Sequence, residues 1–146
     1  MQLVHSPMRL VLLVVALVAI YFAGRFAGRV KEDPPDMGAI SFALEHEAAE
    51  LNATLPEQVS ETMRLDKATT GPGNAFTYVY TIVDDDAAKA LQRDFVQLNK
   101  LKKQLQERVC TMMPEYRARG TIVGYSLRDA AGATLAEITV NPRDCS

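Results

Sequence analysis

The most hydrophobic part of the chain is an uncharged segment near its N-terminus, residues 10–24. It is shorter than the roughly 20 apolar residues that cross a bilayer as a helix. Arg9 and Arg25 flank it, and arginine side chains can reach the membrane surface while their stems stay in the apolar layer. We therefore predict a transmembrane helix in residues 10–28, which contacts membrane lipid and belongs to an N-terminal tail and anchor of residues 1–30.

A cleaved signal peptide is the alternative for this segment. Cleavage needs small residues two positions apart, in an A-x-A-like pattern. Ala19, Ala23 and Ala27 each have a larger residue two positions earlier, so we expect an uncleaved anchor. The same three alanines recur at every fourth position, which leaves open a dimer formed by the membrane helix.

The charges beside the segment and the cysteines predict opposite orientations. Arg25, Arg29 and Lys31 follow the segment, and the positive-inside rule would place the C-terminal domain in the cytoplasm. A pair of cysteines in a small domain favours an oxidising compartment instead. We give the cysteines more weight and predict that the domain lies outside the cytoplasm.

Beyond the anchor, the pattern of apolar and polar residues predicts a spacer and then a mixed domain, residues 37–146. Residues 31–36 are charged and contain Pro34 and Pro35, so they form a short stiff linker. Helical spacing of apolar residues recurs in two segments, and strand-like composition recurs in four. The predicted helices are residues 37–53 and 87–112, and the predicted strands are residues 61–66, 75–83, 121–129 and 134–140.

The order helix, two strands, helix, two strands predicts an α+β fold with an antiparallel sheet and helices on one face. Residues 70–74, TGPGN, carry the strongest turn signal, because glycine permits unusual backbone angles and proline restricts them. Gly132 marks a second turn between the last two strands. Two hairpins that do not share a sheet are the alternative.

Cys110 and Cys145 are the two cysteines of the chain. In a small exported domain they predict a disulfide, which would close a loop of about 35 residues and contribute roughly 3 to 4 kcal/mol. Two free thiols in a cytoplasmic domain are the alternative. Two cysteines without a neighbouring histidine supply too few ligands for zinc, so we predict no metal and no cofactor.

Charge and catalytic chemistry narrow the classes of function. The net charge of −2 and the scattered basic residues argue against nucleic-acid binding. His46 lies between two glutamates and fits a solvated surface position better than a catalytic one. The acidic run 84–86 fits a helix cap better than a calcium loop.

Four residues are candidates for contacts with a ligand or partner: Arg64, Asp66, Tyr78 and Tyr80. Arg64 and Asp66 lie in the first predicted strand, and the tyrosines share one face of the second. Together they could supply polar groups to a pocket on the sheet. Burial of the tyrosines in the core and an ion pair of Arg64 with a carboxylate at a strand edge are the simpler interpretations.

Several motifs resemble a group of uncharacterised small bacterial envelope proteins with an export signal or a single membrane anchor. The resemblance covers most of residues 51–145 and implies a bacterial origin, an envelope location and paired cysteines, but no activity. The matching residues are Leu51-Asn52, Leu55-Pro56, Thr62, Arg64-Leu65-Asp66, Gly71-Pro72-Gly73-Asn74, Tyr78-Val79-Tyr80-Thr81, Val109-Cys110, Gly120, Tyr125, Gly132 and Asp144-Cys145.

These observations lead us to expect a single-pass inner-membrane protein whose periplasmic domain binds a protein partner or assembles with copies of itself. The alternative from a different class is a small-ligand binder or enzyme with a pocket on the sheet. A pilin-like subunit is a weaker alternative, because Pro34 and Pro35 break the continuity between the hydrophobic helix and the domain.

Overall fold

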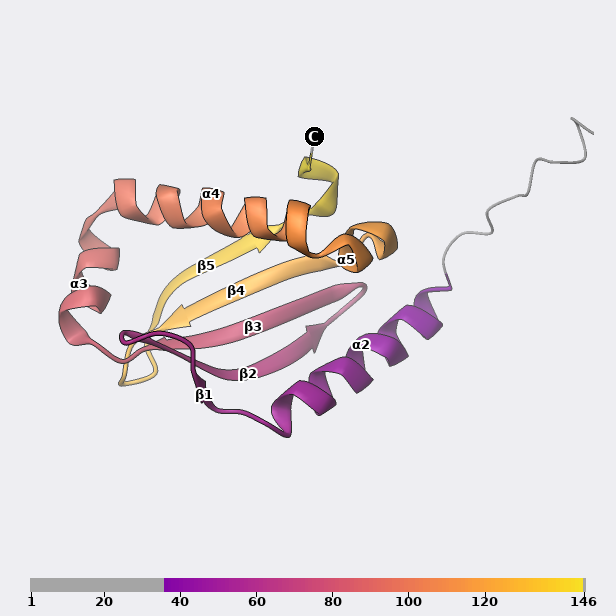
Figure 1. Ribbon diagram of the computed structural model, residues 1–146, viewed down its shortest axis with the longest axis horizontal. Helices are drawn as coiled ribbons and strands as arrows, with labels where there is room; N and C mark the ends of the chain where they lie inside the picture. Colours follow the sequence, from indigo (N-terminus) through magenta and orange to yellow (C-terminus); the bar gives the residue numbers. More distant parts are fainter. Residues whose placement is uncertain (1–35, 146) are drawn as a thin grey trace, which may run out of the picture. The chain divides into compact units, whose positions relative to one another are not determined.

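A computed structural model describes residues 36–145 (Figure 1). The predicted transmembrane segment, residues 10–28, lies outside the described residues. Among residues 36–145, no helix combines the length and apolar character needed to cross a membrane. The elements are α2 (Met37–Asn52), β1 (Glu57–Gln58), β2 (Met63–Gly71), β3 (Ala75–Ile82), α3 (Asp85–Arg93), α4 (Phe95–Met112), α5 (Pro114–Arg119), β4 (Ile122–Arg128), β5 (Thr134–Val140) and the 3₁₀ turn η1 (Pro142–Asp144).

The strands form one sheet in the order β1-β2-β3-β4-β5, so the alternative of two separate hairpins is wrong. β2 pairs antiparallel with β3 and β4 pairs antiparallel with β5, around the two predicted turns. β3 and β4 pair in parallel, and the prediction of an antiparallel sheet is wrong for this central pair. The reason is the helical connection between them, which returns the chain to the end of the sheet where β3 begins.

The predicted helix of residues 87–112 is in fact two helices that meet at Asp94. Asp94 has an extended backbone (φ −108°, ψ 95°), and its carboxylate accepts a hydrogen bond from the N–H of Val96 at 2.9 Å. This N-cap starts α4 as a separate helix. Asp84 caps α3 in the same way, as predicted for the acidic run, by accepting a hydrogen bond from the N–H of Ala87 at 2.7 Å.

The helices pack on one face of the sheet, as predicted. Alternation along β3 points Phe76, Tyr78 and Tyr80 to this face. The buried cluster joins sheet residues to Leu44 of α2 and Val109 of α4. Figure 1 shows α4 lying along β4 and β5, with α2 beside β2. The cross-strand rows of this face are Thr70–Phe76–Val123–Val140, Ala68–Tyr78–Tyr125–Ile138 and Leu65–Tyr80–Leu127–Ala136.

Candidate functional site

Three tyrosines stand side by side on the helix-covered face. Tyr78 of β3 is the register partner of Tyr125 on β4, and Tyr80 lies two residues further along β3. The rings of Tyr78 and Tyr125 stack with their centroids 5.7 Å apart, and those of Tyr80 and Tyr125 stack at 6.4 Å. Because neighbouring strands hold the rings in register, the three form an ordered aromatic floor.

A cleft of about 610 Å³ lies over this floor, between α4 and the β1–β2 side of the sheet. We name it the tyrosine groove. One wall comes from α4 and the residue after it, and the other comes from the end of α2 and the residues between β1 and β2. Besides the three tyrosines, the lining includes Leu51, Val59, Ser60, Leu105, Arg108 and Met113.

A second cleft of about 370 Å³ is a neighbour of the groove, because Tyr78 and Met113 line both. Glu47 and Glu115 contribute carboxylates to this second cleft. The two clefts therefore differ in charge, because Arg108 lines the tyrosine groove and acidic side chains line its neighbour.

A directed chain of hydrogen bonds joins three residues that line the second cleft, Tyr78, Tyr116 and Glu47. The Tyr116 hydroxyl donates to Glu47 Oε1 at 2.5 Å, because a carboxylate can only accept. The Tyr78 hydroxyl lies 3.5 Å from that of Tyr116 and must be the donor of that pair, since the proton of Tyr116 is already used. Arg119 Nη2 lies 3.5 Å from the other oxygen of Glu47 and completes the network.

The hydroxyl of Tyr125 differs from that of Tyr78, because it is buried and has no hydrogen-bond partner among the described residues. Burial raises the pKa of Tyr125, its tyrosine neighbours raise it further, and the charge of Arg108 opposes them. Burial also raises the pKa of Tyr78 and of Tyr80. All three hydroxyls therefore stay protonated near neutral pH and act as donors.

Arg64 and Asp66 lie on the opposite face of the sheet from the tyrosines. Arg64 pairs with Thr81 across the strands, whereas Tyr80 pairs with Leu65. Successive strand residues point to opposite faces. The four candidate contact residues therefore do not share a pocket: Tyr78 and Tyr80 line the tyrosine groove, and the charged pair does not.

The charged pair forms its own polar cluster on the second face. Arg64 Nε donates to Asp66 Oδ1 at 2.5 Å, and the Thr81 hydroxyl donates to the other carboxylate oxygen. Burial raises the pKa of Asp66, but these hydrogen bonds and the charges of Arg64 and Arg128 outweigh it, so the pKa lies below its usual range. The simpler interpretation of Arg64, an ion pair with a carboxylate, is confirmed.

The described residues contain little catalytic chemistry. Within residues 36–145, no group of three histidine, cysteine or acidic side chains is placed to hold a metal ion. His46 is exposed, and its Nδ1 lies 3.7 Å from Glu50 Oε2 on the same helix. The site therefore offers apolar surface, aromatic rings, hydroxyl donors and a guanidinium.

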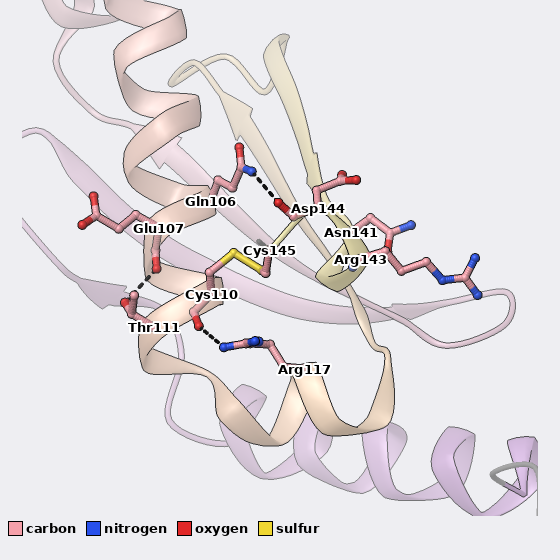
Figure 2. Close-up of a disulfide and its surroundings, with 9 residues drawn as sticks. All are labelled: Gln106, Glu107, Cys110, Thr111, Arg117, Asn141, Arg143, Asp144 and Cys145. Atoms are coloured by element: carbon pink, nitrogen blue, oxygen red, sulfur yellow. Dashed lines mark hydrogen bonds between the residues drawn. A yellow bond between two sulfur atoms is a disulfide. The ribbon is translucent and has the colours of Figure 1, made fainter.

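The predicted disulfide between Cys110 and Cys145 is present, with the Cα atoms 5.4 Å apart (Figure 2). It joins the last turn of α4 to the end of the chain. Gln106 Nε2 donates to the backbone oxygen of Asp144 at 3.3 Å, and Arg117 Nη1 donates to the backbone oxygen of Cys110 at 2.8 Å. The bridge thus anchors the part of α4 that forms one wall of the tyrosine groove.

Sequence reasoning missed Arg108, Tyr125 and Val59 as site residues. Tyr125 is the register partner of Tyr78 only because β3 and β4 are parallel neighbours, a pairing that the local pattern does not reveal. Arg108 looks like an ordinary polar residue of an amphipathic helix. The alternation of residues 121–129, which places Tyr125 with buried Val123 and Leu127, was the one available signal.

No protein-family model matches the chain, and no curated protein matches it in sequence. Solved structures do share its fold. A Pseudomonas aeruginosa protein described as secreted has a TM-score of 0.66 and 20% identity, and the match covers 78% of this chain and 99% of that one.

Two pilotins of type II secretion systems are also similar in structure. EpsS of Vibrio vulnificus has a TM-score of 0.59 and 13% identity, and AspS of Vibrio cholerae has a TM-score of 0.55 and 14% identity. Each match covers 75% of this chain and 94% of the pilotin. At these identities the likeness concerns the fold: the described domain has the α+β fold seen in a secreted protein and in type II secretion pilotins.

Proposed function

We propose that the domain is an envelope interaction module that binds a segment of a protein partner in the tyrosine groove. The observation that carries the proposal is the groove itself, an open cleft of about 610 Å³ on the face where the helices otherwise cover the sheet. Tyrosine and arginine are enriched among the residues that dominate binding energy at protein interfaces. A largely apolar groove between a helix and other elements suits an inserted peptide or helix.

The comparisons support a role in an envelope assembly. Two of the similar structures are pilotins, which belong to type II secretion systems. A third similar structure is described as a secreted protein. These likenesses agree with a location in the envelope, and the apolar and aromatic chemistry of the groove favours a binding role over a catalytic one.

We further propose that residues 10–28 anchor the protein in the bacterial inner membrane and that the domain lies in the periplasm. The apolar segment supports the anchor, and the disulfide supports an oxidising compartment. A reporter fused after Ser146 tests the orientation. Activity of a periplasm-dependent reporter supports it, whereas activity of a cytoplasm-dependent reporter would show that the basic residues after the segment decide the topology.

A small apolar ligand is the second candidate occupant, because the volume of the groove falls within the roughly 300–1,000 Å³ of small-molecule sites. A second copy of this chain is the third. Both are outcomes of the experiment that tests the main proposal.

Site-specific photocrosslinking in intact cells tests the proposed function. A photoreactive residue at Ser60, on the rim of the groove, should form one discrete adduct with another protein, and a photoreactive residue at Thr139, on the opposite face, should not. Val59→Glu should abolish the adduct, because it places a charge on the apolar rim. Val59 is 48% exposed, so the fold tolerates the change.

Val96→Glu is the matched control, since Val96 is 74% exposed and lies outside the groove. It should leave the adduct intact. An adduct that survives Val59→Glu, or that forms equally from Thr139, would contradict binding in the groove. An adduct with a second copy of the chain would replace the separate partner with self-assembly, and a lipid or metabolite adduct would favour the small-ligand alternative.

A further inference from the structure

The tyrosine groove contains a donor that the domain itself leaves unused. Tyr125 is 3% exposed, and its hydroxyl has no hydrogen-bond partner among the described residues. Buried hydroxyl groups in folded proteins normally have a partner. Tyr125 lines the cleft, and a group that enters the cleft and displaces the atoms covering this hydroxyl can accept its proton.

Tyr78, the stacked neighbour of Tyr125, cannot fill the same role. Its hydroxyl proton is directed at Tyr116, whose own proton goes to Glu47. The chain Tyr78–Tyr116–Glu47 therefore points away from the tyrosine groove and into the second cleft. Of this stacked pair, Tyr125 is the one whose hydroxyl is left for an occupant.

Arg108 adds a positive charge to the same cleft. Arg108 lines the cleft together with Tyr78, Tyr80 and Tyr125, and its charge lowers the pKa of all three tyrosines. The ion pairs within residues 36–145 involve His46, Arg64 and Arg119, and none involves Arg108. A guanidinium and an unpartnered hydroxyl donor, on two residues that line one cleft, favour an anion as its occupant.

The apolar lining of the groove distinguishes between a small free anion and an anionic group on a larger ligand. The cleft is also lined by the apolar side chains of Leu51, Val59, Leu105 and Met113. A small hydrated anion would leave this apolar surface in contact with water. The planar, forked guanidinium matches a carboxylate with two parallel hydrogen bonds. In a peptide, the carboxylate of a glutamate or aspartate would accept hydrogen bonds from the donors, and apolar neighbours would cover the apolar lining.

We propose that the partner segment is an apolar peptide that anchors itself with one carboxylate, held between the guanidinium of Arg108 and the hydroxyl of Tyr125. The inference rests on the proposed function, since it names the chemistry of the segment that the groove receives. Where the segment also reaches the neighbouring cleft, which Glu47 and Glu115 line, a basic or neutral residue fits and an acidic one does not.

Peptides selected from a random displayed library against the full chain in detergent micelles test the inference. Peptides that also bind the Val59→Glu chain are removed, so that those retained bind the groove. The retained peptides should share an acidic residue among apolar ones. Changing that residue to its amide should weaken binding by about tenfold or more, the strength of a charge-assisted hydrogen bond.

Variants of the protein then locate the carboxylate. Arg108→Gln should bind the acidic peptide and its amide version with equal affinity, and Arg108→Lys should recover part of the difference. Tyr125→Phe keeps the ring and should lower the affinity for the acidic peptide more than the affinity for its amide version. Arg93→Gln, an exposed arginine on α3, is the matched control and should change neither affinity.

The two proposals fail in different ways. If the retained peptides lack an acidic residue, or if Arg108→Gln preserves the preference for the acid, the groove still binds peptides but the carboxylate inference is wrong. If every selected peptide binds the Val59→Glu chain unchanged, the groove is not the binding site and the proposed function is wrong as well.

Discussion

Asn52, the last residue of α2, attaches that helix to the edge of the sheet. Its side-chain amide donates to the backbone oxygen of Ala68 at 2.8 Å, and its oxygen accepts from the N–H of the same residue at 2.7 Å. β1 pairs only with Arg64 and Leu65, so no strand reaches Ala68 on that side. Asn52 therefore takes the place of a neighbouring strand at this position.

Replacing Asn52 with alanine should destabilise the domain by about 1–3 kcal/mol, because it leaves a buried N–H and C=O of Ala68 without partners. Urea unfolding should show a lower midpoint with an unchanged slope. Asn99→Ala, at an exposed position of α4, is the control and should have little effect. Equal midpoints for the two variants would show that the contact with Ala68 contributes nothing.

Gly124 occupies a position where a side chain has no room. A Cβ atom built there would lie 2.5 Å from Thr77 Oγ1 and 3.2 Å from Thr77 Cγ2. Thr77 is the register partner of Gly124 across the parallel pair, and its branched side chain has few alternative rotamers. The glycine thus accommodates Thr77 on the face of the sheet away from the helices.

Gly124→Ala should lower the free energy of unfolding by about 1–3 kcal/mol, because the added methyl group overlaps Thr77. Adding Thr77→Ala to the same chain should recover most of this loss. Thermal melts of the two single variants and the double variant measure the coupling. Losses that simply add in the double variant would mean that Thr77 is not the obstacle.

At the scale of elements, the sequence predicted α2, β3, β5 and both hairpin turns, because each has an uninterrupted local pattern. The break at Asp94 was missed because the apolar stripe continues across it, and only the extended backbone of Asp94 interrupts the helix. The parallel pairing of β3 and β4 depends on the path of a long connection, and no residue within either strand encodes it.

The disulfide is the element-scale feature with the largest expected effect on stability. Cys110→Ser or Cys145→Ser should lower stability by roughly 3–4 kcal/mol, because the unfolded chain regains the freedom of a closed loop. The melting temperature should fall by about 10 °C or more for a domain of this size. The double variant should match the single variants, since all three remove the same bond; a double variant as stable as the parent would contradict the prediction.

The tyrosines predict a stability limit at alkaline pH. Burial raises the pKa of Tyr78, Tyr80, Tyr116 and Tyr125, and the hydrogen bond to Glu47 adds to this for Tyr116. Above pH of about 10 the unfolded chain releases these protons and the folded chain retains them. The contribution of these tyrosines to the free energy of unfolding should therefore be fully present below that pH and should decrease as the pH rises above it.

Absorbance of tyrosinate, followed in native and urea-unfolded protein, measures this difference directly. Tyr125→Phe should reduce both the delayed ionisation and the loss of stability at high pH. Ionisation of all tyrosines near their ordinary pKa in the native protein would show that the rings of the groove floor are freely hydrated.

At the scale of the whole molecule, the sequence predicted the fold class but not the site. Tyr78 and Tyr80 were found because aromatic residues stand out in a strand, whereas Arg64 and Asp66 were grouped with them without knowledge of the face each occupies. The groove requires α4, the end of α2 and the residues after β1 to meet over β3. Such a meeting of distant segments follows from the tertiary packing, which local patterns do not specify.

Hydrogen exchange of the full chain, with and without the partner crosslinked from Ser60, shows whether a protein partner occupies the tyrosine groove. Occupancy of the groove should slow the exchange of backbone amides in residues 59–65 and 105–113, with no change in β5. Protection confined to β5 and the opposite face of the sheet, or no protection at residues 59–65 and 105–113, would contradict it.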